Sequence, residues 1–309
     1  MSALAQPLAR RQAIDVAAAA IMVWLTFSWG LNGVAAKIGN SGYNPIVLSI
    51  VRSVIAAVLV FAWCRWRRIP LFDRDRTLLP GILAGALFGA EFALIFFGLE
   101  FTTVARSTLL VNTMPFWVLV GAHFLLGERM SGGAVAGLLL AFAGVVVVFS
   151  DRLSSPGPDA WMGDLMSIGA GALWGATTLA IRRSTLAAAR AEKVLLYQLV
   201  AAPILSLPLL PLGGAMLREP DALNTAALLF QGVYIAAFTY MVWFWMVARY
   251  PAAGLSSFAF LTPVFGVLLG AIVLDEPLTW RIGLALALIA TGILIVNRPA
   301  RRQAVISDA

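Results

Sequence analysis

The chain has 309 residues, of which 61% are hydrophobic and 12% are charged, with a mean hydropathy of +0.90 and a formal net charge of +7. Soluble domains carry about a quarter charged residues, so this composition excludes a water-soluble globule and indicates that lipid is the solvent. The one cysteine, Cys64, excludes a disulfide framework, and the one histidine, His123, excludes a site that needs several imidazoles. The basic residues lie in short loops between apolar segments, which does not indicate nucleic-acid binding.

Ten apolar segments are each long enough to cross about 30 Å of hydrocarbon. They are expected near residues 15–37, 44–64, 78–99, 104–126, 132–150, 161–181, 193–212, 224–247, 252–274 and 280–297. The first segment is too long for a signal peptide and no small-residue cleavage site ends it, so we expect it to remain as a helix. The sequence therefore predicts an all-α integral membrane protein with ten transmembrane helices.

The distribution of basic residues predicts the orientation, because cytoplasmic loops are enriched in Lys and Arg. If the N-terminus is inside, 16 of the 22 basic residues lie in cytoplasmic segments. The tails, residues 1–14 and 298–309, are then both cytoplasmic, which requires an even number of spans.

The two halves of the chain share motifs in the same order. Pro115 and Pro263 are 148 positions apart, as are Glu128 and Glu276, and Trp29-Gly30 matches Trp174-Gly175 at an offset of 145. We therefore expect two five-helix repeats, at residues 15–150 and 161–297. Since five is odd, the second repeat must be inverted relative to the first, an arrangement typical of secondary transporters. The alternative is a duplication that serves structure only.

These motifs are also the basis of a family resemblance. With a Trp-Gly in each first helix, a mid-helix proline in each fourth helix and a Gly-Glu or Asp-Glu turn after it, residues 15–297 resemble the EamA-type ten-helix transporters of the drug/metabolite transporter superfamily. The sequence is most similar to the YddG-type exporters of aromatic and other neutral amino acids. The resemblance implies a multi-pass protein of the bacterial inner membrane that exports small amphipathic metabolites. The two turns differ, Gly127-Glu128-Arg129 against Asp275-Glu276-Pro277, so their roles need not be equal.

Pro115 and Pro263 are expected to kink their helices, since proline removes a backbone hydrogen bond and clashes with the preceding turn. The carbonyl groups freed in this way must find partners or face a wet cavity. Polar neighbours that could serve as partners or contact a substrate are Asn112, Thr113, Ser256, Ser257 and Thr262. The kinks either act in gating or only improve packing.

Gly81, Gly85 and Gly89 are spaced by four and form one smooth stripe on the third helix, which predicts close approach of a neighbouring helix. The stripe could be a static packing or dimerisation surface, or a surface on which one helix slides during gating.

Six aromatic residues lie well inside their helices: Trp29, Trp117, Trp174, Tyr240, Trp243 and Trp245. Of these, Trp29, Trp174 and Tyr240 are candidates to line a substrate cavity. Rings that face lipid would give the same pattern, so this pattern by itself does not indicate an aromatic substrate.

Two charges, Arg52 and Glu91, also lie inside apolar helices, where ionisable residues mark a functional site by default. Both are eight positions from the expected outer ends of their helices, so their depths match. We expect an ion pair that orients the two charged groups of a zwitterion. The alternative is a pair that only fixes helix packing.

Other functional classes have little support in the sequence. There is no phosphate-binding Gly-x-x-x-x-Gly-Lys-Ser/Thr loop, so transport is expected to be passive or coupled to an ion gradient, with no cofactor. Neither His-Glu-x-x-His nor Gly-x-Ser-x-Gly occurs, so no catalytic residue or metal site is expected and an intramembrane enzyme is disfavoured. A channel, or a carrier of another metabolite or drug class, stays open. The expected partners are a small-molecule substrate and the bilayer, and the oligomeric state is left open.

Overall fold

The computed structural model of the protein describes residues 11, 13–73, 75–98, 101–150, 157–274 and 280–298. Its α-helices are α1 (Val16–Gly42), α2 (Pro45–Trp66), α3 (Leu78–Gly98), α4 (Val104–Val111), α5 (Met114–Leu126), α6 (Gly132–Phe149), α7 (Ala160–Arg183), α8 (Ala191–Ser206), α9 (Ala222–Leu229), α10 (Tyr240–Arg249), α11 (Ala252–Ser257), α12 (Leu261–Leu274) and α13 (Arg281–Val296). The 3₁₀ segments are η2 (Thr185–Ala188), η3 (Leu207–Gly213) and η5 (Phe258–Phe260), and η4 (Phe230–Thr239) is a π-helix. Most of the predicted tails and the predicted turn at 275–277 lie outside the described residues.

Within these ranges, nine helical stretches are long and apolar enough to cross a membrane, and α13 is a shorter apolar helix. Four of the stretches are composite: α4 with α5, α8 with η3, α9 with η4 and α10, and α11 with η5 and α12. The prediction of an all-helical membrane protein is confirmed.

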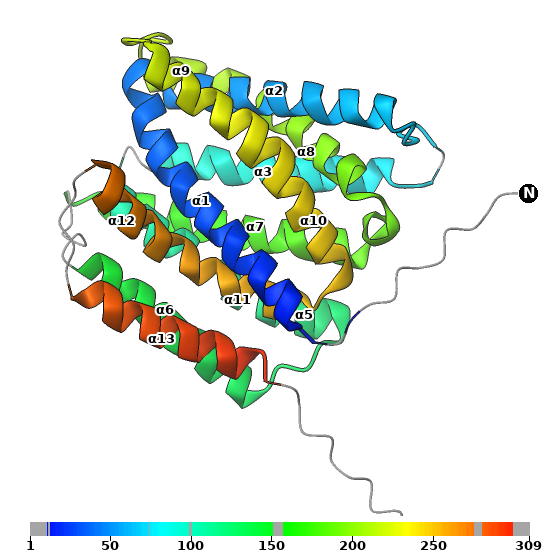
Figure 1. Ribbon diagram of the computed structural model, residues 1–309, viewed down its shortest axis with the longest axis vertical. Coiled ribbons are helices and arrows are strands. Elements are labelled where there is room, and N and C mark those ends of the chain that lie inside the picture. Colours follow the sequence, from blue (N-terminus) through cyan, green and yellow to red (C-terminus); the bar gives the residue numbers. More distant parts are fainter. Residues whose placement is uncertain are drawn as a thin grey trace, which may run out of the picture.

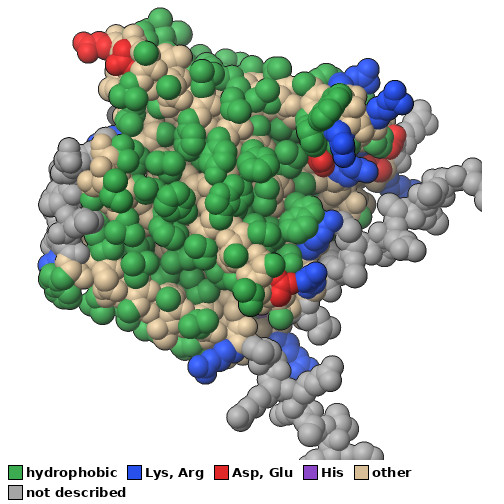
Figure 2. All heavy atoms as spheres, viewed as in Figure 1, with side chains coloured by type: hydrophobic (Ala, Val, Ile, Leu, Met, Phe, Trp, Pro, Cys, Tyr) green, Lys and Arg blue, Asp and Glu red, His purple; other side chains and the backbone are tan. Residues whose placement is uncertain are grey.

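The outer surface matches a lipid environment. Figure 2 shows a broad hydrophobic area across the viewed face, with most of the visible Lys and Arg side chains along one edge of the molecule. Large apolar side chains that are more than half exposed include Val58, Leu83, Phe124, Ile204 and Ile272. In water such a continuous apolar surface would cause aggregation, whereas in a bilayer it contacts acyl chains.

Helices of one half pack mainly against helices of the other (Figure 1). Helix α1 packs on α12, and the related helix α7 packs on α5. Helix α3 packs on α7 and α8, and α2 packs on α8 and η4. The fifth helices of the two halves, α6 and α13, pack on each other. The equivalent contacts follow the sequence repeat, so the two halves form one intertwined bundle.

The two Trp-Gly motifs explain how these helices approach. A Cβ atom added to Gly30 would lie 2.7 Å from Phe265 Cβ and 2.8 Å from the backbone nitrogen of Gly266. A Cβ atom on Gly175 would lie 3.0 Å from Trp117 Cβ. Phe265 and Trp117 are themselves 148 positions apart, so they are equivalent positions of the two repeats. Each glycine therefore allows its helix to approach the equivalent helix of the other half closely.

The two helices that were expected to kink at Pro115 and Pro263 are interrupted just before these residues. Helix α4 ends at Val111 and α5 begins at Met114, whereas the 3₁₀ segment η5 separates α11 from α12 two residues before Pro263. Polar side chains accompany the first break: Asn112 Nδ2 donates to the carbonyl of Thr108 at 2.8 Å and Thr113 Oγ1 donates to that of Leu110 at 2.7 Å. These bonds satisfy carbonyl groups at the end of α4, as a break in lipid requires.

The connection between α2 and α3 is attached to α8 by an ion pair. Lys193 Nζ donates to Asp75 Oδ2 at 2.8 Å, and Thr77 Oγ1 donates to Asp75 Oδ1 at 2.6 Å. Partial burial opposes ionisation of Asp75, but these hydrogen bonds and the Lys193 charge outweigh it and hold the pKa of Asp75 below its usual value. The contact therefore persists at neutral pH and weakens as the pH falls through this lowered pKa.

Candidate functional site

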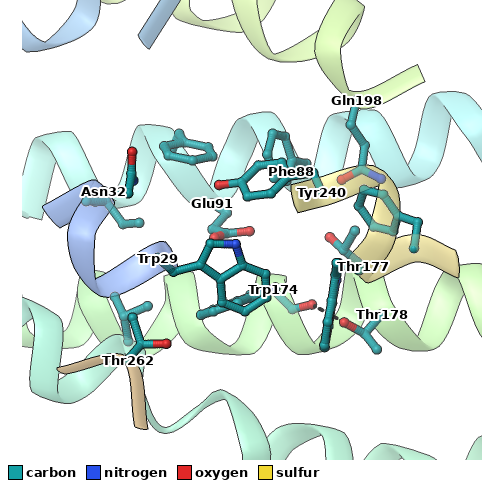
Figure 3. Close-up of a pocket in the computed structure, with 15 residues that line it drawn as sticks. Trp29, Asn32, Phe88, Glu91, Trp174, Thr177, Thr178, Gln198, Tyr240 and Thr262 are labelled. Carbon is teal, nitrogen blue, oxygen red and sulfur yellow. Dashed lines mark hydrogen bonds between the residues drawn. The ribbon is translucent and has the colours of Figure 1, made fainter. Parts of the chain in front are cut away.

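A cavity of about 230 Å³ lies inside the bundle, between helices of both halves. Its walls come from α1, α3, α4, α7, α8, α10 and α12 (Figure 3). The lining residues are mostly aromatic or aliphatic, with a few polar side chains: Trp29, Asn32, Phe88, Glu91, Phe92, Ile95, Val111, Trp174, Thr177, Thr178, Gln198, Tyr240, Trp243, Phe244 and Thr262. An apolar cavity with a few polar groups is the usual form of a small-molecule site.

Trp29 organises the aromatic wall. Its indole ring packs edge-on against Tyr240 at a centroid distance of 6.3 Å and against Trp243 at 5.5 Å. The indole nitrogen donates to Thr239 Oγ1 at 3.1 Å, at the end of the π-helix η4. This bond and the edge-on contacts fix one orientation of the ring, so the wall is largely preformed.

The second tryptophan predicted for the cavity, Trp174, lines it from α7. One turn further along each helix, Asn32 follows Trp29 and Thr177 follows Trp174, and both also line the cavity. These residues are related by the 145-residue offset, so α1 and α7 present matching positions. The hydroxyl groups of Thr177 and Thr178 donate to carbonyls of their own helix, at 2.9 and 3.2 Å.

The expected ion pair between Arg52 and Glu91 is not formed. Within the described part of the chain, Arg52 Nε and Glu91 Oε2 are both buried and without a hydrogen-bond partner. Helices α2 and α3 each pack mainly against α8 (Figure 1), and the charge of Arg52 acts on the Glu91 carboxyl group without a direct contact. Glu91 lines the cavity, whereas Arg52 is not among the lining residues and its guanidinium lies 5.2 Å from the ring centroid of Phe92.

Four other candidates for substrate contact, Asn112, Thr113, Ser256 and Ser257, are not among the lining residues. Asn112 and Thr113 bind carbonyls at the end of α4, as described above. Ser256 and Ser257 are fully buried and donate to the carbonyls of Ala253 at 3.1 Å and Gly254 at 2.7 Å. In this conformation all four contribute to local helix structure.

The glycine stripe of α3 packs against α8. A Cβ atom on Gly85 would lie 2.7 Å from Ala201 Cβ, and one on Gly89 would lie 2.5 Å from Leu205 Cδ1. The predicted close approach of a neighbouring helix is confirmed. The stripe holds two cavity-lining helices together, since Glu91 and Gln198 lie on α3 and α8.

A polar cluster connects the two halves beyond one end of the cavity. Arg182 Nη2, at the end of α7, donates to Glu128 Oε1 at 2.9 Å, and the backbone nitrogen of Ala252 approaches the same oxygen at 3.4 Å. Arg182 Nη1 also donates to the carbonyl oxygens of Val247 and Tyr250. The side chain of Arg182 is 8% exposed and that of Glu128 is 24% exposed, so this partly buried cluster joins the ends of α5, α7, α10 and α11.

Comparison with known proteins matches both halves to one family. Residues 17–150 and 161–298 each match the EamA-like transporter family. The chain belongs to this family. It is therefore a membrane transporter of the drug/metabolite transporter superfamily, as the motifs predicted.

Two curated relatives cover nearly the whole EamA-like chain. "Uncharacterized transporter YoaV" of Bacillus subtilis is 26% identical over 281 residues, which span 89% of this chain and 94% of that protein. A "Probable amino-acid metabolite efflux pump" of Escherichia coli is 26% identical over 276 residues, which span 86% of this chain and 90% of that protein. A solved crystal structure with 23% identity has a TM-score of 0.80 and covers 92% of this chain and 99% of its own, which shows a shared fold.

Several cavity residues of this EamA-like transporter were not among the candidates from sequence, notably Asn32, Thr177 and Gln198. The first two could have been found by extending the Trp29 and Trp174 match by one helical turn on the same face. Gln198 lies at the position related to Arg52 by the repeat and is 0% exposed. Apolar composition around it gives no indication that it faces a cavity.

Proposed function

We propose that the protein is a secondary transporter of the bacterial inner membrane that exports small amphipathic metabolites, with aromatic and other neutral amino acids among its substrates. The observation that carries the proposal is the aromatic cavity of about 230 Å³ between the two halves. Its apolar walls suit a large neutral side chain, and its few polar groups suit the charged end of the same molecule. The relative named as an amino-acid metabolite efflux pump supports the same substrate class.

Transport by alternating access fits the packing. Matched helices of two inverted repeats border the cavity, so rocking one set against the other can open it to either side in turn. The breaks next to Pro115 and Pro263 supply points where a helix can change direction without losing many hydrogen bonds. The glycines Gly85 and Gly89 supply a smooth contact along which α3 can shift on α8.

Counterflow in proteoliposomes tests this function. Vesicles preloaded with unlabelled tryptophan are expected to accumulate labelled tryptophan, phenylalanine and leucine saturably and without ATP. Trp174→Ala removes a cavity wall and is expected to lower the counterflow rate about tenfold, the size of one lost aromatic contact. Trp161→Ala on the same helix is the matched control, because Trp161 is 58% exposed and faces away from the core.

Several outcomes would contradict the proposal. Equal rates in the Trp174 and Trp161 variants would remove the cavity from the transport path. Movement of phosphorylated or nucleotide-linked sugars, with no amino acid moved, would assign another substrate class. Steady currents far above carrier rates would indicate a channel.

The proposed orientation places both termini in the cytoplasm and can be tested by cysteine labelling. Cys64 is fully buried and is replaced by Ser to give a background without other thiols. A cysteine at the exposed position 219, between η3 and α9, is expected to react with an impermeant maleimide in intact cells. A cysteine at the exposed position 190, between η2 and α8, is expected to react only in opened membranes. The reverse pattern would invert the topology.

A further inference from the structure

The cavity contains buried polar atoms that the protein itself does not satisfy. In the described part of the chain, six buried side-chain nitrogen or oxygen atoms lack a hydrogen-bond partner. Four of the six belong to cavity-lining residues: Asn32 Oδ1, Glu91 Oε2, Gln198 Oε1 and Thr262 Oγ1. Native proteins leave few such atoms unpaired, and a cluster of them in one cavity points to a missing partner.

All four atoms are hydrogen-bond acceptors. Three are carbonyl or carboxylate oxygens that can only accept, and the hydroxyl of Thr262 can also donate. The lining residues contain one acidic side chain, Glu91, and no Lys, Arg or His. Arg52, which was expected to supply a positive charge here, is not among the lining residues: its guanidinium lies 5.2 Å from the ring centroid of Phe92, and its charge acts on Glu91 without a direct contact. The cavity therefore favours N–H donors and positive charge, and it offers no cation to a carboxylate.

Glu91 is the strongest of these groups. It is 6% exposed, and Figure 3 shows its carboxylate in the middle of the labelled residues, near Trp29 and Tyr240. A carboxyl group in this position carries a large desolvation cost unless a counter-charge or a proton accompanies it. A proton would occupy one oxygen of Glu91 and leave the other three acceptors unpaired. A ligand with several N–H donors can satisfy more of them.

The aromatic walls favour an organic cation over a metal ion. Trp29, Trp174, Tyr240 and Trp243 line the same cavity as the acidic group, and the faces of such rings attract ammonium groups. Hard metal cations take six or more oxygen ligands, whereas Glu91 is the single carboxylate among the described lining residues.

We propose that this cavity is a recognition site for a primary ammonium group, with Glu91 as its counter-ion and the aromatic walls around the apolar body of the same molecule. Gln198, Asn32 and Thr262 accept hydrogen bonds from other donors along that molecule. The substrate class is then aromatic or apolar amines, of which amino acids are members through their amino group. The inference rests on the proposed function, because it assigns the recognised group within the transport cavity.

The test compares three ligands that share an indole ring and differ in charge. Tryptamine carries only the ammonium group, tryptophan carries both charges, and N-acetyltryptophan carries only the carboxylate. Isothermal titration calorimetry of the purified protein measures the affinity of each. Tryptamine is expected to bind at least as tightly as tryptophan, and N-acetyltryptophan about tenfold more weakly or worse.

Glu91→Gln keeps the shape of the side chain and removes its charge. This variant is expected to weaken the affinity for tryptamine about 30-fold and to leave the affinity for N-acetyltryptophan unchanged. Glu219→Gln removes a carboxylate from an exposed loop and is expected to change neither affinity. The melting temperature of Glu91→Gln without ligand is measured alongside that of the wild type, to show whether the variant folds. If this variant does not fold, the order of the three wild-type affinities tests the proposal by itself.

The outcomes separate this inference from the proposed function. Equal binding of N-acetyltryptophan and tryptamine, with tryptophan counterflow intact, would overturn the ammonium site and leave the transport function. Glu91-dependent binding of tryptamine without counterflow of any amino acid would retain the site and overturn the amino-acid substrate. Failure of all three ligands to bind the wild type would overturn the site.

Discussion

Arg182→Gln is expected to destabilise the folded protein by about 3 kcal/mol, because it leaves the Glu128 carboxylate and the carbonyls of Val247 and Tyr250 without their donor. Glu128→Gln is expected to cost less, since Arg182 then keeps both carbonyl partners. Thermal unfolding in detergent, followed by near-ultraviolet circular dichroism, measures both effects. The double variant is expected to lose less stability than the two single losses added together, because the two charges are removed together.

Arg183→Gln is the matched control for this cluster. Arg183 is the next residue along α7 and is exposed, so its replacement is expected to change stability by less than about 0.5 kcal/mol. Equal stability of the Arg182 and Arg183 variants would show that the cluster does not hold the two halves together.

Gly30→Ala is expected to destabilise the protein by about 2 to 3 kcal/mol and to lower counterflow strongly. The added methyl group would meet the backbone of Phe265 and Gly266 at 2.8 to 2.9 Å, so α12 must move away from α1. The same movement displaces cavity walls, because Trp29 and Asn32 lie on α1 and Thr262 lies on α12. Thermal unfolding and the counterflow rate, measured on the same preparation, report the two effects.

Gly33→Ala on the same helix provides the comparison. A Cβ atom at Gly33 has no neighbour within 4 Å among the described residues, so the change is expected to be neutral or to stabilise by up to about 1 kcal/mol through helix propensity. If Gly30→Ala behaves like Gly33→Ala, the α1–α12 contact is more compliant than its geometry indicates.

Much of the architecture could be predicted because lipid simplifies the problem. The length of each apolar segment predicts a helix, and the positions of Pro115 and Pro263 predict where two of them break. The match between Trp29-Gly30 and Trp174-Gly175 also predicts two related close contacts. What the sequence does not predict is the π-helix at Phe230–Thr239, since it contains neither proline nor any pattern that distinguishes it from an α-helix.

The site was harder to predict because depth in the membrane does not determine the direction of a side chain. Arg52 and Glu91 lie at similar distances from the ends of their helices, but those helices pack mainly against α8, and the two side chains do not form an ion pair. Four polar residues next to helix breaks donate hydrogen bonds to backbone carbonyl groups and do not line the cavity: Asn112, Thr113, Ser256 and Ser257. Trp29, Glu91, Trp174 and Tyr240 do meet in one cavity, because their helices face the centre of the bundle.

The exchange of partners between the two halves also bears on how the chain is made. Helix α1 leaves the ribosome long before α12, and α3 before α7 and α8, so the first half enters the membrane with its main packing surfaces still facing lipid. Lipid satisfies these apolar faces without drawing them together, since acyl chains are as apolar as the side chains themselves. Insertion and assembly are therefore separate events in the biogenesis of this protein: the first half inserts as it is synthesised, and the bundle closes only after the second half has followed it.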